Sequence, residues 1–227
     1  MRSDIDRLMA ERQLDAFIIP SHEGEDHARD YITGGVHASA MVVKKQGQPA
    51  VLVANHMEID EAAKSGLEVL TFDAFNQTEI LRQHGRGTEQ AAQALWARML
   101  DTFGIQGRYT LYGQQDIQAT LRLQSVLSAL NNDQRHLVHD QTPTVLDIAS
   151  ETKDAEELTK LREVGQRTSA VVRATRAWLG THRLNGEDIV DASGQALTIG
   201  AVKRFVRQQF AATRPGRRRR DDLCPGA

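Results

Sequence analysis

The sequence predicts an α/β layer fold with a partly parallel, helix-covered sheet. Residues 38–54 hold two apolar runs separated by Gln46-Gly47-Gln48-Pro49, which predicts a hairpin whose second strand is buried on both faces. A helical segment ending at Gly66 and another apolar run, Leu67–Phe72, come next. Because a strand–helix–strand order requires a crossover, we expect part of the sheet to be parallel.

The composition limits the kinds of protein to which this chain can belong. The 227 residues suffice for one large domain, or for one domain and part of a second. The 28 Lys and Arg residues nearly balance 30 Asp and Glu residues, which favours no polyanionic partner. No segment approaches the ~20 apolar residues of a membrane span. The single cysteine, Cys224, excludes a disulfide framework, and we expect a cytoplasmic protein without a membrane partner.

The elements before the hairpin are short. Leu14–Pro20 is an apolar segment and predicts a strand, Ser21–Asp30 a polar loop, and the paired glycines of Tyr31–Gly35 a tight turn. The first element is a helix that Ser3 caps, with an apolar face formed by Ile5, Leu8 and Met9.

Helices and strands continue to alternate after the hairpin. We expect an amphipathic helix from about Thr88 to Phe103, a strand at Arg108–Tyr112, a second helix at Ile117–Leu130 and a weak edge strand at His136–His139. This gives five or six strands and four helices up to about residue 140, the alternation that is typical of an α/β layer fold.

The pattern changes near Pro143. One long helix is predicted over Thr152–Thr181, capped by Thr152, and Thr198 caps a last helix. The long helix carries an apolar stripe formed by Leu158, Leu161, Val164, Thr168, Val171, Val172, Thr175 and Leu179. After residue 212 the sequence becomes TRPGRRRRDDLCPGA, unlike any earlier segment. We therefore divide the chain into 1–142, 143–212 and 213–227.

Four stretches resemble the creatinase/prolidase/aminopeptidase P family, the pita-bread metallopeptidases. They are RLMAERQLDAFIIPS with YITGGVHASAMVVKKQGQPAVLVANHMEIDEAAKSG, then RYTLYG, and the junction ASETKDAEELTKLREVGQRTSAVV. The resemblance implies that 1–142 is an N-terminal domain with a mixed sheet and helices on both faces, similar to ribonuclease H in topology. It also implies that 143–212 is the start of the pita-bread peptidase domain.

The same resemblance implies the activity of a parent enzyme, an Xaa-Pro aminopeptidase or dipeptidase. Family members hold two divalent metal ions with two aspartates, one histidine and two glutamates, all downstream of the equivalent of Phe210. No catalytic or metal-binding residue is therefore assigned, and we expect a truncated, inactive fragment that binds no cofactor. A peptide substrate is expected only for an intact parent. The segment 213–227 fits a frameshift, and the alternative is an authentic, disordered basic tail.

Two other functions stay open at this point. The first is a non-catalytic protein-binding module on the same fold. The second is nucleic-acid binding through Arg217–Arg220, although no aromatic residue is interleaved with these arginines. Because family members are commonly dimers, we also expect a homodimer, through the N-terminal domain or through the exposed stripe of the long helix.

Tyr31 and His37 flank the double glycine and are the candidate substrate-edge or interface residues. The resemblance supports them, because the N-terminal domain of some family members borders an active site near such a loop; a structural role is the alternative for each. His22 and His27 lie among three acids, but their spacing differs from HExxH, and a solvated loop is favoured over a metal site.

Overall fold

The computed structural model describes residues 1–213 and contains two compact units, Met1–Asp154 and the segment from Ala155 onward. The first unit extends beyond residue 142, because helix α7 (Val145–Glu151) packs on the same core as helix α1 (Ile5–Glu11). The predicted basic tail, with Arg217–Arg220, lies outside the described residues except for its first position.

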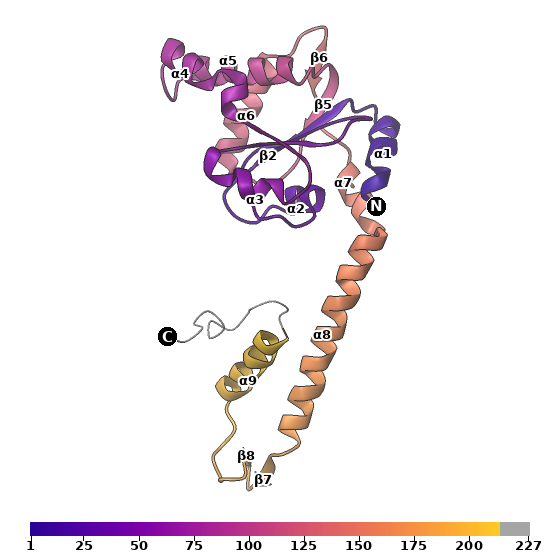
Figure 1. Ribbon diagram of the computed structural model, residues 1–227, viewed down its shortest axis with the longest axis vertical. Helices are drawn as coiled ribbons and strands as arrows, with labels where there is room; N and C mark the ends of the chain where they lie inside the picture. The colour runs from indigo at the N-terminus through magenta and orange to yellow at the C-terminus, as the bar shows by residue number, and fades with distance from the viewer. Residues whose placement is uncertain (214–227) are drawn as a thin grey trace, which may run out of the picture. The chain divides into compact units, whose positions relative to one another are not determined.

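The first unit is built on a six-stranded mixed sheet with the order β4-β3-β2-β1-β5-β6 (Figure 1). The predicted hairpin is confirmed as the antiparallel pair β2–β3, and the predicted crossover is confirmed because β3 and β4 are parallel. Strand β1 is antiparallel to β2 and parallel to β5, which is parallel to the edge strand β6. The strands are β1 Ala16–Ile19, β2 Met41–Lys45, β3 Val51–Ala54, β4 Glu68–Thr71, β5 Gly107–Leu111 and β6 Arg135–Leu137.

Helices cover both faces of this sheet, as expected. Successive side chains of a strand point to opposite faces, so Phe17 and Ile19 of β1 lie in one core and Ala16 and Ile18 in the other. Helices α1, α3 and α7 contribute to the first core. The second core contains residues from α5 (Glu89–Thr102) and α6 (Ile117–Ala129), the two amphipathic helices that the sequence predicts.

Two local predictions are wrong in detail, and one helix was missed. A 3₁₀ turn at Arg2–Asp4 precedes α1, so Ser3 lies inside this turn and does not cap the helix. The polar loop is shorter than predicted, because helix α2 (His27–Thr33) begins within it and ends at Gly34, whose φ is +74°. Helix α4 (Gln77–His84) was not predicted.

The helical segment after the hairpin is also irregular. It consists of a 3₁₀ turn at His56–Glu58 and the short helix α3 (Ile59–Ala63), before Gly66 with φ +73°. Ala62 is buried, but Met57 is 93% exposed. Met57 and Ala62 therefore do not share one apolar face, because the chain changes from 3₁₀ to α geometry between them.

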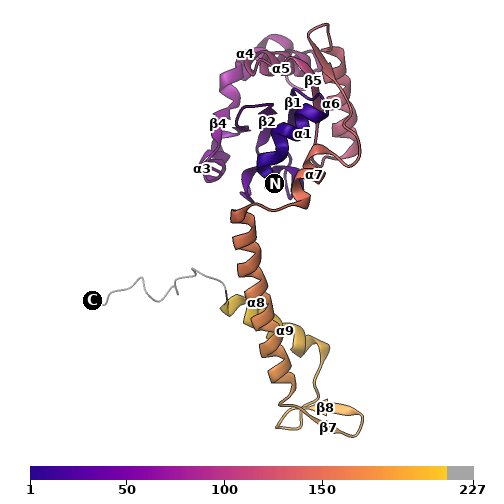
Figure 2. The same ribbon diagram turned by 90° about the vertical axis from the view of Figure 1, so that its right-hand side faces the viewer.

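Over residues 155–213 the second unit consists of two helices and a small hairpin (Figure 2). Thr152 ends α7, so the long helix α8 begins at Ala155 and not at a Thr152 cap. Thr198 caps α9 as predicted, since its Oγ1 accepts a hydrogen bond from the Ala201 backbone N–H at 3.1 Å. The elements are α8 Ala155–Leu179, β7 Arg183–Asn185, β8 Asp188–Val190 and α9 Ile199–Ala212.

No helix within residues 1–213 has the length and apolar character that a membrane crossing requires.

Candidate functional site

The neighbouring strands β1 and β5 are parallel, so the loops that follow them meet at the same end of the sheet. Asp26 joins these loops and is only 1% exposed. Its Oδ1 accepts a hydrogen bond from the Arg29 backbone N–H at 3.0 Å and caps α2. Its Oδ2 accepts one from the Gln114 backbone N–H at 2.7 Å. One carboxylate thus starts a helix and fixes the loop after β5.

The buried side chain of Arg29 binds the backbone of the loop after β1. The residue is 2% exposed, and its guanidinium donates to the carbonyl oxygens of His22 at 2.8 Å and Gly24 at 2.5 Å. The segment Ser21–Asp30 is largely exposed to solvent, as predicted, but its Asp26 and Arg29 are buried.

Gly113 allows the two loops to approach each other. Its φ is +100°, and a Cβ atom at this position would lie 2.6 Å from Asp26 Oδ2 and 2.8 Å from Ile19 Cγ2. Both distances are shorter than van der Waals contact. The loop after β5 can therefore pack on β1 only with glycine at this position.

A second buried carboxylate, Asp140, completes this end of the sheet. Its side chain is 4% exposed and accepts hydrogen bonds from Tyr112 Oη at 2.6 Å, Arg12 Nη1 at 3.1 Å and the Val145 backbone N–H at 2.8 Å. Burial, and then the hydrogen bond to Asp140, raises the pKa of Tyr112. This cluster connects α1, the end of β5 and the start of α7.

A cavity of about 600 Å³ lies beside these two carboxylates. Tyr31, a predicted site residue, lines this cavity, and its hydroxyl donates to the Ala149 carbonyl oxygen at 2.9 Å. His37 is exposed and does not line the cavity. The structure therefore does not bring the two predicted residues into one cavity. Other polar lining residues are His27, Tyr112, Gln114, Thr144, Asp147 and Ser150.

Most residues that line this cavity were not predicted from the sequence. Asp147 and Ser150 belong to α7, a helix of seven residues that follows Pro143 and was not predicted. Its signal was available, because Thr144 and Asp147 form a capping box, with Thr144 Oγ1 accepting from the Asp147 backbone N–H at 3.2 Å.

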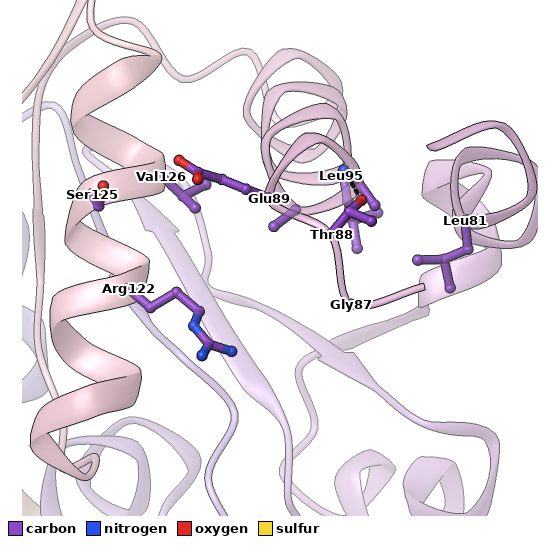
Figure 3. Close-up of a pocket in the computed structure, with 10 residues that line it drawn as sticks. Leu81, Gly87, Thr88, Glu89, Leu95, Arg122, Ser125 and Val126 are labelled. Carbon is purple, nitrogen blue, oxygen red and sulfur yellow. Dashed lines mark hydrogen bonds between the residues drawn. The ribbon is translucent and has the colours of Figure 1, made fainter. Parts of the chain in front are cut away.

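A second groove, of about 550 Å³, lies between α6 and the start of α5 (Figure 3). Leu81, Leu95 and Val126 form its apolar part. Arg122 extends from α6 into the open space, and Glu89 extends from the first turn of α5 toward α6 (Figure 3). The groove thus combines an apolar floor with two charges of opposite sign.

Hydrogen-bonding and charged groups line these two sites. Within residues 1–213 no group of three or more His, Cys, Asp and Glu side chains is arranged to hold a metal ion. The two divalent ions that the resemblance implies therefore have no ligand set among the described residues. The cavity at the end of β5 offers hydroxyl, amide and imidazole groups that can form hydrogen bonds with a ligand.

Comparison with known families agrees with this fold. The model of the creatinase/prolidase N-terminal domain matches residues 2–137, which is more than half of the chain. The chain belongs to this family. No curated protein matches the sequence.

Solved peptidase structures share the fold over nearly the whole chain. The X-Pro aminopeptidase from Thermotoga maritima MSB8 matches 94% of this chain with a TM-score of 0.55 at 12% identity. Dipeptidase PepE from Mycobacterium ulcerans matches 93% with 0.54 at 15% identity, and prolidase from Pyrococcus furiosus matches 94% with 0.52 at 12% identity. The matches cover 49%, 48% and 53% of those chains, so this chain spans about half their length.

Proposed function

We propose that this chain provides the N-terminal domain of an Xaa-Pro peptidase-like protein and does not itself hydrolyse peptides. The observation that carries the proposal is the family match over residues 2–137, on a fold shared with three solved peptidases. The resemblance assigns the metal ligands of such enzymes to positions downstream of Phe210. The parent protein would act in the cytoplasm, in keeping with the single cysteine.

In this proposal the domain borders the peptide substrate and does not take part in bond cleavage. The cavity beside Tyr31 supports this role, because its rim combines aromatic surface with hydrogen-bonding groups of Gln114 and Ser150. His37, on the exposed segment after α2, would contact the peptide from outside the cavity.

A hydrolysis assay tests the first half of the proposal. The purified chain is incubated with an Ala-Pro dipeptide and with a longer Xaa-Pro peptide, with Mn²⁺ and with a chelator in parallel. We expect no proline-containing product by mass spectrometry in any reaction. Product that forms with Mn²⁺ and disappears with the chelator would show that the chain is itself a metallopeptidase, and the proposal would be wrong.

A titration with the Ala-Pro dipeptide tests the second half. Backbone amide resonances of Tyr31, Gln114 and Ser150 are expected to shift in ¹⁵N-labelled protein, with an affinity on the order of 1 mM. His37→Ala should weaken the response, whereas His136→Ala, an exposed residue of the edge strand β6, should not. Absence of shifts around Tyr31 would contradict the assignment of this cavity.

A second candidate function is a non-catalytic protein-binding module. The groove of Figure 3 favours it, because Arg122 and Glu89 flank apolar side chains that a bound segment would cover. In the same titration with longer peptides, shifts confined to Glu89, Arg122 and Val126 would support this second function over the first.

A further inference from the structure

The wall of the cavity beside Tyr31 contains the carboxylate of Asp147. Asp147 Oδ2 accepts hydrogen bonds from the Thr144 backbone N–H and from Thr144 Oγ1, both at 2.8 Å. Its second oxygen, Oδ1, has no hydrogen-bond partner among the described residues, and no ion pair within residues 1–213 includes Asp147. This carboxylate can therefore accept a further donor.

The rest of the lining offers acceptors and aromatic rings. Among the described residues that line the cavity, none is a lysine or an arginine. Tyr31 and Tyr112 contribute aromatic rings, and the face of such a ring attracts a cation. Both hydroxyl groups already donate hydrogen bonds, that of Tyr31 to a backbone carbonyl oxygen of α7 and that of Tyr112 to Asp140. The wall therefore suits a ligand that carries a positive charge and donates hydrogen bonds.

Cations that contact the surroundings of this cavity bind other acceptors. Arg12 donates to Asp140 at 3.1 Å, and the guanidinium of Arg29 donates to carbonyl oxygens of the loop after β1. Lys153 Nζ donates to a backbone carbonyl oxygen of α7. None of these three side chains forms an ion pair with Asp147. Within residues 1–213 the Asp147 carboxylate is therefore left without a counter-ion.

We propose that this cavity binds an ammonium group of a peptide, with Asp147 as its counter-ion. The inference rests on the proposed function and adds the chemical class of the ligand. Asp147 Oδ1 accepts a charged hydrogen bond from the ammonium, and the ring of Tyr31 or Tyr112 lies beside the cation. Oxygen atoms of Gln114 and Ser150 accept the remaining N–H donors, because Ser150 Oγ uses only its own proton, in a hydrogen bond to the Asp147 carbonyl oxygen.

Two ammonium groups of a peptide fit this chemistry, the α-ammonium at its N-terminus and the ε-ammonium of a lysine side chain. A glutamate side chain does not fit, because no lysine or arginine among the described lining residues can pair with it. The charge should contribute about threefold to tenfold in affinity, between the effects of an exposed ion pair and of a charged hydrogen bond.

Titrations of ¹⁵N-labelled protein with Ala-Pro, N-acetyl-Ala-Pro and N-acetyl-Lys-Pro test the proposal. The amide shifts of Tyr31 and Ser150 give the affinities. If the site takes the α-ammonium, Ala-Pro should bind more tightly than N-acetyl-Ala-Pro by the factor given above. If it takes the side chain, N-acetyl-Lys-Pro should do so. Shifts at Tyr31 with equal affinities for all three peptides would overturn this inference and still support the proposed function. Absence of shifts with every peptide would contradict both.

The variant Asp147→Asn tests the assignment of the counter-ion. It removes the charge and keeps an oxygen that can accept from Thr144, so the start of α7 is preserved. The affinity for the preferred ammonium peptide should fall to that for N-acetyl-Ala-Pro, and the latter should not change, which reports an intact cavity. Glu151→Gln is the matched control, because Glu151 is an exposed acid of the same helix that does not line the cavity. No loss in Asp147→Asn, or an equal loss in both variants, would overturn the proposal.

The salt dependence of the wild type gives an answer even if Asp147→Asn does not fold. Added salt screens the attraction between a carboxylate and an ammonium. It should weaken the binding of the ammonium peptide and leave that of N-acetyl-Ala-Pro unchanged. Affinities for both peptides that respond equally to salt would overturn the proposal.

Discussion

Asp140 is the residue whose loss should harm stability most directly. Its buried carboxylate accepts hydrogen bonds from Arg12, Tyr112 and the Val145 backbone, so its removal takes an acceptor from all three, although Arg12 still donates to the carbonyl oxygens of Gln141 and Pro143. We expect Asp140→Ala to lower the free energy of unfolding by about 1–3 kcal/mol in urea titration. Asp133→Ala, at an exposed aspartate nearby in the sequence, should change it by about 0.5 kcal/mol or less. Equal effects would contradict the role of the cluster.

Gly113 and Gly47 form a matched pair of positions with positive φ. A Cβ at Gly113 would overlap Asp26 and Ile19, whereas at Gly47 no atom lies within 4 Å. Gly47→Ala should lower the free energy of unfolding by about 1–2 kcal/mol through backbone strain alone. Gly113→Ala should add about 1–3 kcal/mol for the steric conflict. Urea unfolding of both variants checks the difference, and similar values would mean that the close approach is unimportant.

Tyr109 makes stability depend on alkaline pH. Burial raises the pKa of Tyr109 to about 12 from an ordinary value of 10.0, and its hydroxyl has no hydrogen-bond partner among the described residues. The folded state therefore holds this proton more tightly than the unfolded state. The resulting stabilisation is complete below pH 10 and is lost as the pH rises through 12, at about 1.4 kcal/mol per pKa unit.

The variant Tyr109→Phe checks this dependence. It should change stability little at pH 7, because the lost hydroxyl had no partner among the described residues. Between pH 9 and pH 11 it should lose less stability than the wild type in urea titrations. An unchanged slope against pH would show that Tyr109 does not titrate as burial implies.

The charged residues of the site illustrate what local sequence cannot reveal. Asp26 and Arg29 lie in a run of polar residues that favours solvent exposure, yet both are buried. Their burial depends on Gln114 and Gly113, which are nearly ninety positions further along the chain. No periodicity within Ser21–Asp30 carries that information. Tyr31 could be singled out from the double glycine, but the cavity that it lines could not.

At the scale of elements, the segments with strong local signals were predicted well. The hairpin has a turn between two apolar runs, and α5 has Thr88 as a cap, whose Oγ1 accepts from the Ala91 backbone N–H at 3.1 Å. The helices α2, α4 and α7, of seven or eight residues each, were missed. In α2 and α4 too few apolar positions define a period, whereas α1 has the same length as α2 but carries the apolar face of Ile5, Leu8 and Met9. For α7 the capping box was the overlooked signal.

The contact between α8 and α9 should be measurable as an energetic coupling. Trp178 and Phe205 are stacked at an interplanar angle of 6°. A double-mutant cycle with Trp178→Ala and Phe205→Ala, read from amide hydrogen exchange in α9, should give a coupling of about 0.5–1.5 kcal/mol. The pair Trp178→Ala and Phe210→Ala serves as the control, because Phe210 is partly exposed and should be uncoupled. Equal couplings would contradict a specific stack.

At the scale of the whole molecule, the first unit should fold without the second. Both hydrophobic cores consist entirely of residues before Asp154. A domain of this length buries roughly 68–70% of its unfolded surface, which is enough for independent stability. We expect the fragment 1–154 to give the dispersed NMR spectrum of a folded domain, with the amide shifts that this unit has in the full chain. A collapsed or aggregated fragment would show that α8 and α9 are needed for folding.

The same fragment tests the proposed function at the first unit. It retains the cavity beside Tyr31, so it should keep the response to the Ala-Pro dipeptide. Loss of that response in a folded fragment would contradict the assignment of the cavity.

The central position of β1 has a consequence for the order of events during synthesis. Strand β1 can pair with β2 as soon as the hairpin has left the ribosome. Its other side cannot pair until β5, which ends at Leu111, has been synthesised. At ~5–20 residues per second, roughly 60 residues of translation separate the two pairings by several seconds. During that interval an apolar strand edge stays unpaired, and such an edge is a template for aggregation. The nascent chain is thus most in need of a chaperone between the completion of the hairpin and the arrival of β5.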